Sequence, residues 1–293
     1  MAKRKLKGHW IFISITVASI LIFSFLTPKG QKTYDAWQEN LRSQTNIWHH
    51  KVGRPLPGTP DLTKFQERLT ARNLKLGAPL FMRVFKLEGE LEVWMQGPEG
   101  FTLFATYPIC RWSGGLGPKL KEGDGQSPEG IYTVRKGQLN PNSRWYRSFN
   151  LGYPNAYDKA YNRTGSFLMV HGGCSSIGCY AMTNPVMKEI WDLVTATYKK
   201  GSKSFMVHAF PFRMTERNMR LYSNTKWQPL WHDLKVAYDL FEENHIPPEV
   251  NVCQKRYVVT KGSLKKKTYQ SPIKQGCPPK KVSSQRKPLS TVN

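Results

Sequence analysis

Phe167-Leu168-Met169-Val170-His171-Gly172-Gly173-Cys174-Ser175-Ser176-Ile177-Gly178-Cys179-Tyr180-Ala181-Met182 is the stretch that decides the fold of this chain. Its first four residues form an uninterrupted apolar run, which is typical of a buried strand. Asn184-Pro185 then predicts a helix start, with Asn184 as the cap and Pro185 at the first helical position. We therefore expect His171 at the end of a strand and Cys179 shortly before a helix.

A cysteine in this setting is suited to nucleophilic chemistry. A free thiol titrates near ~8.5, so little thiolate exists at neutral pH. An adjacent imidazole can take the proton, and a helix N-terminus stabilises the resulting anion. The glycines leave backbone N–H groups free to face a developing oxyanion. This layout predicts acyl transfer through a thioester.

The motif formed by Ser176-Ile177-Gly178-Cys179 and the upstream His171-Gly172 resembles the YkuD-type L,D-transpeptidases, the cysteine enzymes of bacterial peptidoglycan. The resemblance is greater to the YafK-like branch of that family. It extends from about residue 79 to 260 and rests also on residues 113–119, 127–130, 153–158 and 211–214. Two features depart from most relatives: Ala181 stands where an Arg is usual, and the interval from His171 to Cys179 is short.

The resemblance implies a mostly β (α+β) fold, a mixed sheet or sandwich with a few flanking helices. It also implies an enzyme acting on peptidoglycan stem peptides without a cofactor or a metal. Cys179 would attack the carbonyl at the L-centre of diaminopimelate and form a thioester. His171 would act as base and then as acid, oriented by the backbone carbonyl of Gly172. The expected substrate contacts are Ser176, Gly178, Tyr180, Tyr153 and Asn155, with N–H groups around Gly178 to Tyr180 holding the oxyanion.

The acyl acceptor stays open. An amine acceptor would make a cross-link or attach an envelope protein, a role in cell-wall biogenesis and cell shape. Water would make the enzyme a hydrolase (an L,D-carboxypeptidase or an amidase/endopeptidase) that releases a stem-peptide partner. A third reading is a non-catalytic envelope-binding module.

The chain is strongly basic, with a formal charge of +24 from 44 Lys and Arg against 20 Asp and Glu. Such a charge calls for an anionic partner, and nucleic acid is the usual first class. The aromatic residues, however, belong to expected strands and helices, with no RNA- or DNA-reading motif. The Gly-rich loop at 114–117 lacks the Gly-Lys-Ser/Thr ending of a phosphate loop. We therefore expect no nucleic-acid partner.

Basic residues precede an apolar run near the start of the chain. Residues 10–26 are seventeen positions without a charge, behind Lys3, Arg4, Lys5 and Lys7. This is the pattern of an export signal, and no Ala-x-Ala cleavage site follows it. An uncleaved signal anchor in the inner membrane is favoured over a removed signal peptide, with a buried core helix as the other reading. The positive-inside rule then predicts a periplasmic catalytic domain.

We expect four segments: a signal peptide or signal anchor at 1–30, a linker with short helices at 31–78, the catalytic domain at 79–260, and a basic flexible tail at 261–293. From Gln254 onward the chain has eleven Lys or Arg and no acidic residue. The tail is predicted to be either a solvated extension or a segment that adheres to anionic envelope polymer or lipid. Strands are expected at 81–87, 90–96, 101–110, 131–134, 204–209, 250–252 and 257–259, and helices near 62–69, 185–199 and 227–241.

Five cysteines must be assigned. Pairing Cys110 with Cys174, and Cys253 with Cys277, would leave Cys179 free, but connectivity cannot be read from sequence. Cys174 is the rival nucleophile because it lies nearer His171 in the chain. A zinc site of His171, Cys174, Cys179 and His208 is a further alternative, although the spacing follows no common zinc module.

Overall fold

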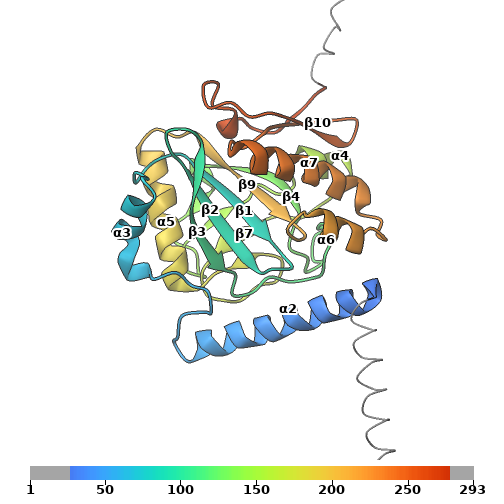
Figure 1. Cartoon of the computed structure of the whole chain (residues 1–293), viewed down its shortest axis with the longest axis horizontal. Coiled ribbons are helices and arrows are strands. Elements are labelled where there is room, and N and C mark those ends of the chain that lie inside the picture. The colour runs from blue at the N-terminus through green and yellow to red at the C-terminus, as the bar shows by residue number, and fades with distance from the viewer. Residues whose placement is uncertain (1–26, 278–293) are drawn as a thin grey trace, which may run out of the picture.

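A computed structural model of the protein describes residues 27–277 (Figure 1). The predicted signal anchor at residues 10–26 lies outside the described residues. Within residues 27–277, the structure contains no helix with the length and apolar character needed to span a membrane.

A five-stranded mixed sheet forms the centre of the molecule. Its order is β3 (Phe101–Pro108), β2 (Glu90–Gln96), β1 (Leu80–Phe85), β9 (Ser204–Phe210) and β4 (Gly130–Arg135). β1 and β9 run parallel, and the other neighbours are antiparallel. Every residue of β1 and β9 is buried, as expected for central strands covered on both faces.

The two faces of this sheet contribute to two separate hydrophobic cores. Met82 and Val84 belong to the core that includes α5 (Asn184–Lys199). Phe81 and Phe85, which alternate with them along β1, belong to the core that includes α7 (Gln228–Asn244). Figure 1 shows α5 and α7 on opposite sides of the sheet.

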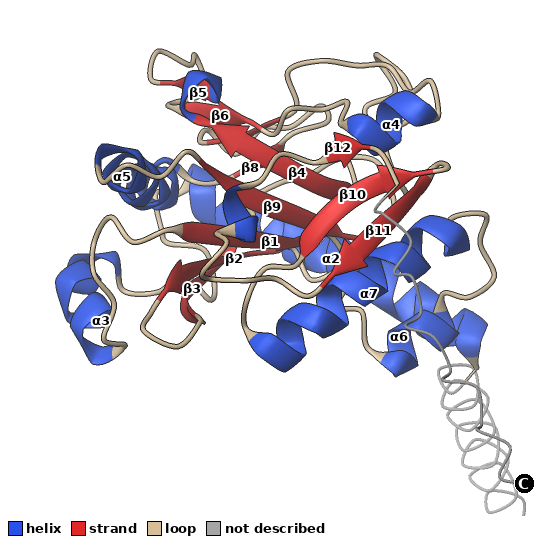
Figure 2. Ribbon diagram, turned by 90° about the horizontal axis from the view of Figure 1, so that it is seen from above, coloured by secondary structure: helices blue, strands red, loops and turns tan. Residues whose placement is uncertain are grey.

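Two smaller sheets flank the central one (Figure 2). The first, in the order β5-β6-β7-β8, consists of Leu139–Asn140, Ser148–Asn150, Met169–His171 and Tyr180–Ala181. The second, in the order β11-β10-β12, consists of Arg256–Thr260, Glu249–Cys253 and Lys274–Gln275. The remaining helices are α2 (Pro28–Lys51), α3 (Phe65–Ala71), α4 (Ala156–Ala160) and α6 (Glu216–Leu221), with 3-10 turns at Leu62–Lys64, Lys136–Gln138 and Thr268–Gln270.

The expected fold class is confirmed: mixed sheets are flanked by helices, and the predicted strands and helices lie close to their expected positions. Two local details differ. The strand before the active-site loop begins at Met169, because Phe167 adopts a left-handed φ of 55°. Thr183, not Asn184, is the N-cap of α5, since the Asn184 side chain accepts a hydrogen bond from the Gly173 N–H instead.

The folded unit extends beyond the predicted boundaries of 79 and 260. Leu69 and Leu74 from the supposed linker are part of the hydrophobic core. On the C-terminal side, Tyr269 is buried and donates to Gln96, and β12 pairs with β10. Residues 261–277 are therefore packed structure and not a flexible tail, because burying an aromatic ring and pairing a strand fixes the segment. Residues 278–293 lie outside the described part.

The proposed cysteine pairing is confirmed. Cys110 is bonded to Cys174 and Cys253 to Cys277, which leaves Cys179 free. All five cysteines of the chain lie within residues 27–277. Cys179 is therefore the only thiol in the protein, and Cys174 is excluded as the nucleophile in this disulfide-bonded state.

Candidate active site

Parallel pairing of β7 and β8 brings Cys179 close to His171. Val170 is the partner of Tyr180, and His171 is the partner of Ala181. Cys179 immediately precedes β8, so in this register it lies beside Met169. Residues two apart on a strand share a face of the sheet, so His171 and Cys179 point to the same side. Both line one cavity of about 360 Å³.

His171 is held by its own backbone neighbour. Its Nδ1 lies 2.5 Å from the Gly172 carbonyl oxygen, the arrangement that the resemblance implied. The ring is almost completely buried, and the ring of Trp145 stacks on it at a centroid distance of 6.1 Å. Burial lowers the pKa of His171 from its usual 6.5, and the hydrogen bond to Gly172 opposes this shift. The imidazole is therefore neutral at neutral pH.

Asn184 fixes the peptide that orients His171. Its Oδ1 accepts a hydrogen bond of 2.8 Å from the Gly173 N–H, which belongs to the same peptide plane as the Gly172 carbonyl. A Cβ at position 172 would lie 2.6 Å from the Asn184 Oδ1 and 3.0 Å from the Trp145 carbonyl oxygen. Only glycine fits there. Sequence reasoning assigned Asn184 to a helix cap and missed this contact.

The Cys179 thiol is neutral in the resting structure. Its Sγ accepts from the Met169 N–H at 3.4 Å and donates to the Phe167 carbonyl at 3.6 Å. Burial raises the pKa of the thiol, while the Met169 hydrogen bond and the charge of Lys119 oppose the rise. Within residues 27–277, no hydrogen bond joins the thiol to His171. The short strand β8 lies between Cys179 and α5, which begins at Asn184, so Cys179 stands shortly before a helix as expected.

Serine hydroxyls hold the turn that carries Cys179. Ser176 and Ser127 donate to the Cys179 carbonyl at 2.7 and 3.1 Å. Ser113 accepts from the Gly178 N–H at 2.6 Å. Ser176, expected to contact substrate, is instead a buried support, and the Gly178 N–H is already occupied. Ser113 and Ser127 lie in the Gly-rich loop, within two of the stretches that carry the family resemblance (113–119 and 127–130), and the sequence assigned neither residue a role.

Lys86 holds this Gly-rich loop in place through hydrogen bonds of its ammonium group. Its ammonium donates to the carbonyls of Gly115, Gly117 and Ser127 at 2.7–3.0 Å and to Glu129 at 3.1 Å. The side chain is fully buried at the end of β1, so burial lowers the pKa of Lys86 while Glu129 opposes the shift. Nothing in the local sequence marked Lys86, because its partners lie at least 29 positions away.

The other predicted substrate contacts lie outside the cavity. Tyr180 is buried and donates to the Pro128 carbonyl. Tyr153 is buried and donates to the Lys119 carbonyl. Asn155 caps α4 and donates to Ile131 and Tyr257. These three side chains make hydrogen bonds within the protein, so they stabilise the fold around the cavity and do not line it. The lining of the cavity is Asn140, Ser143, Arg144, Trp145, Phe167, Met169, His171, Ser175, Ile177 and Cys179.

The zinc alternative is wrong. Cys174 is consumed in a disulfide, and His208 lies in the core with its ring 4.7 Å from that of Phe81. Among the residues that the structure describes, no cluster of three or more His, Cys, Asp or Glu could hold a metal ion.

The amino-acid sequence of this chain is similar to those of known proteins. The YkuD family model, the L,D-transpeptidase catalytic domain, matches residues 99–208. The protein named "Putative L,D-transpeptidase YafK" from Escherichia coli (strain K12) is 43% identical over 210 residues, which is 72% of this chain and 83% of the relative.

Two solved structures show a lower similarity. The helical cell shape determining protein Pgp2 from Campylobacter jejuni is 16% identical, with a TM-score of 0.37 over 65% of this chain and 80% of that chain. Bd1075 from Bdellovibrio bacteriovorus is 17% identical, with a TM-score of 0.34 over 61% of this chain and 78% of that chain.

Proposed function

The chain belongs to the YkuD family of L,D-transpeptidases, and from this premise we propose that it transfers acyl groups of peptidoglycan stem peptides through a thioester on Cys179. The observation that carries the proposal is the cavity shared by His171 and Cys179, the one free thiol of the chain. A nucleophile and a base on one cavity wall are the minimum that thioester chemistry requires.

Proton transfer accompanies the attack in this proposal. Burial raises the pKa of the thiol and lowers the pKa of the imidazole, and both shifts disfavour a thiolate–imidazolium pair before the attack. The Nδ1–H of His171 donates to the Gly172 carbonyl, which leaves Nε2 as the proton acceptor. A rotation about the Cα–Cβ bond of Cys179 turns the thiol from Phe167 toward that nitrogen. As the S–C bond forms, the thiol proton passes to His171, which then protonates the leaving amine.

The developing oxyanion is assigned to the N–H of Cys179. The Gly178 N–H is bonded to Ser113 and is not available in this structure. The double hydrogen bond from Ser176 and Ser127 to the Cys179 carbonyl fixes the turn, and therefore the direction of the N–H. A preorganised donor of this kind contributes about 10²–10³-fold in rate.

The acceptor is an amine in the transpeptidase form of the proposal, and water in the alternative. The short loop between His171 and Cys179, and the buried Ala181 without a cationic side chain, leave hydrolysis open as the alternative. In both cases the acyl-enzyme on Cys179 is the same.

Mass spectrometry of muropeptides tests the proposal. The enzyme is incubated with a disaccharide tetrapeptide, with and without an added amine. A cross-linked product shows transfer to the amine, and a shortened stem shows hydrolysis. Cys179→Ala should abolish both products, and a carbapenem should add its mass to the wild type and not to this variant. Inactivity of a protein whose Cys179 is demonstrably reduced would contradict catalysis and favour the envelope-binding module.

We also propose a periplasmic catalytic domain held at the inner membrane by residues 10–26. The support is the sequence pattern of basic residues followed by seventeen uncharged positions. Analysis of the N-terminal peptide in the membrane fraction should find the segment retained. A soluble mature chain that lacks these residues would contradict the anchor and leave the catalytic proposal intact.

A further inference from the structure

One side chain in the catalytic cavity has no internal partner. Arg144 lies in the cavity lining with His171 and Cys179, and the lining contains no Asp or Glu. Within residues 27–277, its guanidinium makes no ion pair and no hydrogen bond. Its Cζ lies 5.4 Å from the centroid of the Trp145 ring. Trp145 in turn stacks on His171.

Several other arginines of the domain are paired with carboxylates, whereas Arg144 is among those that make no ion pair in the described part of the chain and lies in the catalytic cavity. Arg163 is bonded to Asp158, Arg213 to Glu90 and Glu92, and Arg256 to Asp233. Even Arg147, three residues away, lies 3.8 Å from an Asp192 oxygen and over the ring of Trp191. A solvent-exposed guanidinium held on an aromatic face keeps all its donors free for a ligand.

We infer that Arg144 binds a free carboxylate of the acyl donor and sets the preference of the site for carboxylate-bearing stems. This inference rests on the proposed function and names a specificity determinant within it. A diaminopimelate residue attacked at its L-centre carries a second carboxylate at its D-centre, and a leaving terminal residue carries another. The fork of an arginine matches a carboxylate with two N–H donors. Ala181 has no charged group and is fully buried, so it cannot make this contact.

The test compares Arg144→Gln with the matched control Arg147→Gln, using three donors. The first donor has both carboxylates free, the second is amidated at the D-centre, and the third is amidated at the C-terminus. On the free donor, kcat/KM should fall about 10-fold in Arg144→Gln, mainly through KM, because one charge-assisted contact is lost. Arg147→Gln should stay near the wild type, and Arg144→Lys should recover part of the loss.

Amidation identifies the carboxylate. The penalty of Arg144→Gln should disappear for the donor whose amide replaces the paired carboxylate, as in a double-mutant cycle. Equal losses on all three donors, or no loss on any, would overturn the inference. Calorimetric binding of the free donor to Cys179→Ala, with and without Arg144→Gln, separates this outcome from failure of the proposed function. Donor binding that weakens about 10-fold without turnover supports the role of Arg144 even if no acyl transfer is found.

An independent feature is the outer face of α2. Tyr34, Trp37, Leu41, Trp48 and Val52 are between 38% and 56% exposed. At 100° per residue these positions fall within one narrow stripe along a helix about 36 Å long. Figure 1 shows α2 lying along the outside of the domain.

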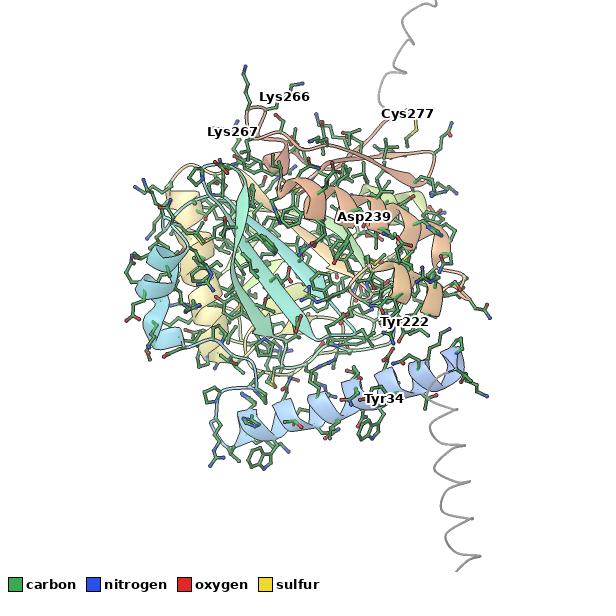
Figure 3. All side chains as sticks on the ribbon, in the orientation of Figure 1. Tyr34, Tyr222, Asp239, Lys266, Lys267 and Cys277 are labelled. Carbon is green, nitrogen blue, oxygen red and sulfur yellow. A yellow bond between two sulfur atoms is a disulfide. The ribbon has the colours of Figure 1, made fainter. Side chains whose placement is uncertain are left out.

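The opposite side of α2 contacts the domain through polar groups. Asp35 accepts from the Tyr222 hydroxyl at 2.8 Å, and Asn46 donates to the Ile109 carbonyl at 3.1 Å (Figure 3 labels Tyr222 next to α2). Arg42 donates to the Leu87 carbonyl. The two acidic residues of the helix, Asp35 and Glu39, lie on this inner side of the helical wheel. The outer stripe is therefore apolar, rich in aromatic residues and free of negative charge.

We propose that the outer stripe of α2 rests in the interfacial zone of a lipid bilayer. Trp and Tyr favour this zone, and exposed Lys29 and Lys51 near the two ends of the helix suit anionic head groups. The sequence adds a second argument, since α2 begins directly after the uncharged residues 10–26.

Fluorescence quenching in the full chain tests this contact. The protein is reconstituted in phosphatidylethanolamine–phosphatidylglycerol vesicles that contain lipids brominated near the head group. Trp37→Gln/Trp48→Gln should lose a measurable part of the quenching seen in the wild type, while Trp94→Phe in the core should not. Equal quenching in the wild type and the double variant would overturn the proposal. A wild-type protein that is dimeric in solution, with a double variant that is monomeric, would also overturn it.

Discussion

The disulfide between Cys110 and Cys174 should be the largest single covalent contribution to stability. It joins Cys110, which follows β3, to Cys174 in the loop between His171 and Cys179, with a sequence separation of 64 residues. We consider the double variant Cys110→Ala/Cys174→Ala, which removes the bond without leaving a free thiol beside Cys179. The two sulfurs are buried in a small apolar cluster with Leu56, so alanine is the mildest replacement.

The expected loss follows from loop-closure entropy in the unfolded chain. A closed loop of 64 residues corresponds to about 4.3 kcal/mol at 25 °C. The second disulfide, Cys253–Cys277, closes 24 residues and corresponds to about 3.5 kcal/mol. For a domain of this size, the larger value lowers Tm by roughly 9–17 °C.

Urea unfolding and thermal scans of both double variants measure the effect. We expect the larger loss for the Cys110/Cys174 pair, with an unchanged m-value in urea. Activity should fall and remain measurable, because Cys179 and His171 keep their places in the parallel strand pair. A loss below about 2 kcal/mol would refute the loop-entropy reasoning. Complete inactivity of a folded variant that retains a labelled Cys179 would show that the loop needs this bond for catalysis.

Three further predictions follow from individual contacts. Asn184→Ala frees the Gly172–Gly173 peptide, so kcat should fall about tenfold while KM stays close to the wild type, and Asn184→Asp should retain part of the rate because its carboxylate can still accept from Gly173. His208 is buried without a hydrogen-bond partner in the described structure, and burial lowers its pKa to about 3. As pH falls from 6.5 toward 3, the unfolded chain therefore binds a proton at His208 that the folded chain does not, so the free energy of unfolding should decline over this range. In acid titrations followed by circular dichroism, His208→Leu should make stability less dependent on pH. Deletion of residues 278–293 should leave Tm unchanged because Tyr269 and Cys277 remain, while binding to peptidoglycan sacculi becomes weaker and less salt-dependent; an identical salt dependence would contradict adhesion through this segment.

Much of the fold was predictable from local pattern. The uninterrupted apolar run before His171 predicted a strand, and the apolar residues at helical spacing after Asn184 predicted a helix. The two disulfides were predicted as the pairing that leaves Cys179 free. His171 was expected at the end of a strand and Cys179 shortly before a helix, and the resemblance to the family motif favoured Cys179 over Cys174 as the nucleophile. Their closeness then results from parallel pairing of β7 and β8.

The supports of the site were not predictable in this way. Lys86, Ser113 and Ser127 act through partners between 29 and 65 positions distant, so no window of sequence contains the interaction. Tyr153 and Asn155 were expected to contact substrate on the basis of the family resemblance. The core instead uses their hydrogen bonds internally, since a buried polar group must find a partner wherever packing places it.

The sequence by itself determined the strand, the loop and the helix, and it predicted the proposed nucleophile–base pair, because these depend on side-chain pattern and on the intrinsic chemistry of a thiol and an imidazole. Tertiary structure alone decided which backbone N–H stays free, which arginine faces the cavity, and that residues 261–277 are packed. Those properties depend on the distances between segments far apart in the chain. Burial lowers the pKa of His171 and raises that of Cys179 for the same reason, since desolvation is a property of the surrounding fold and not of the residue.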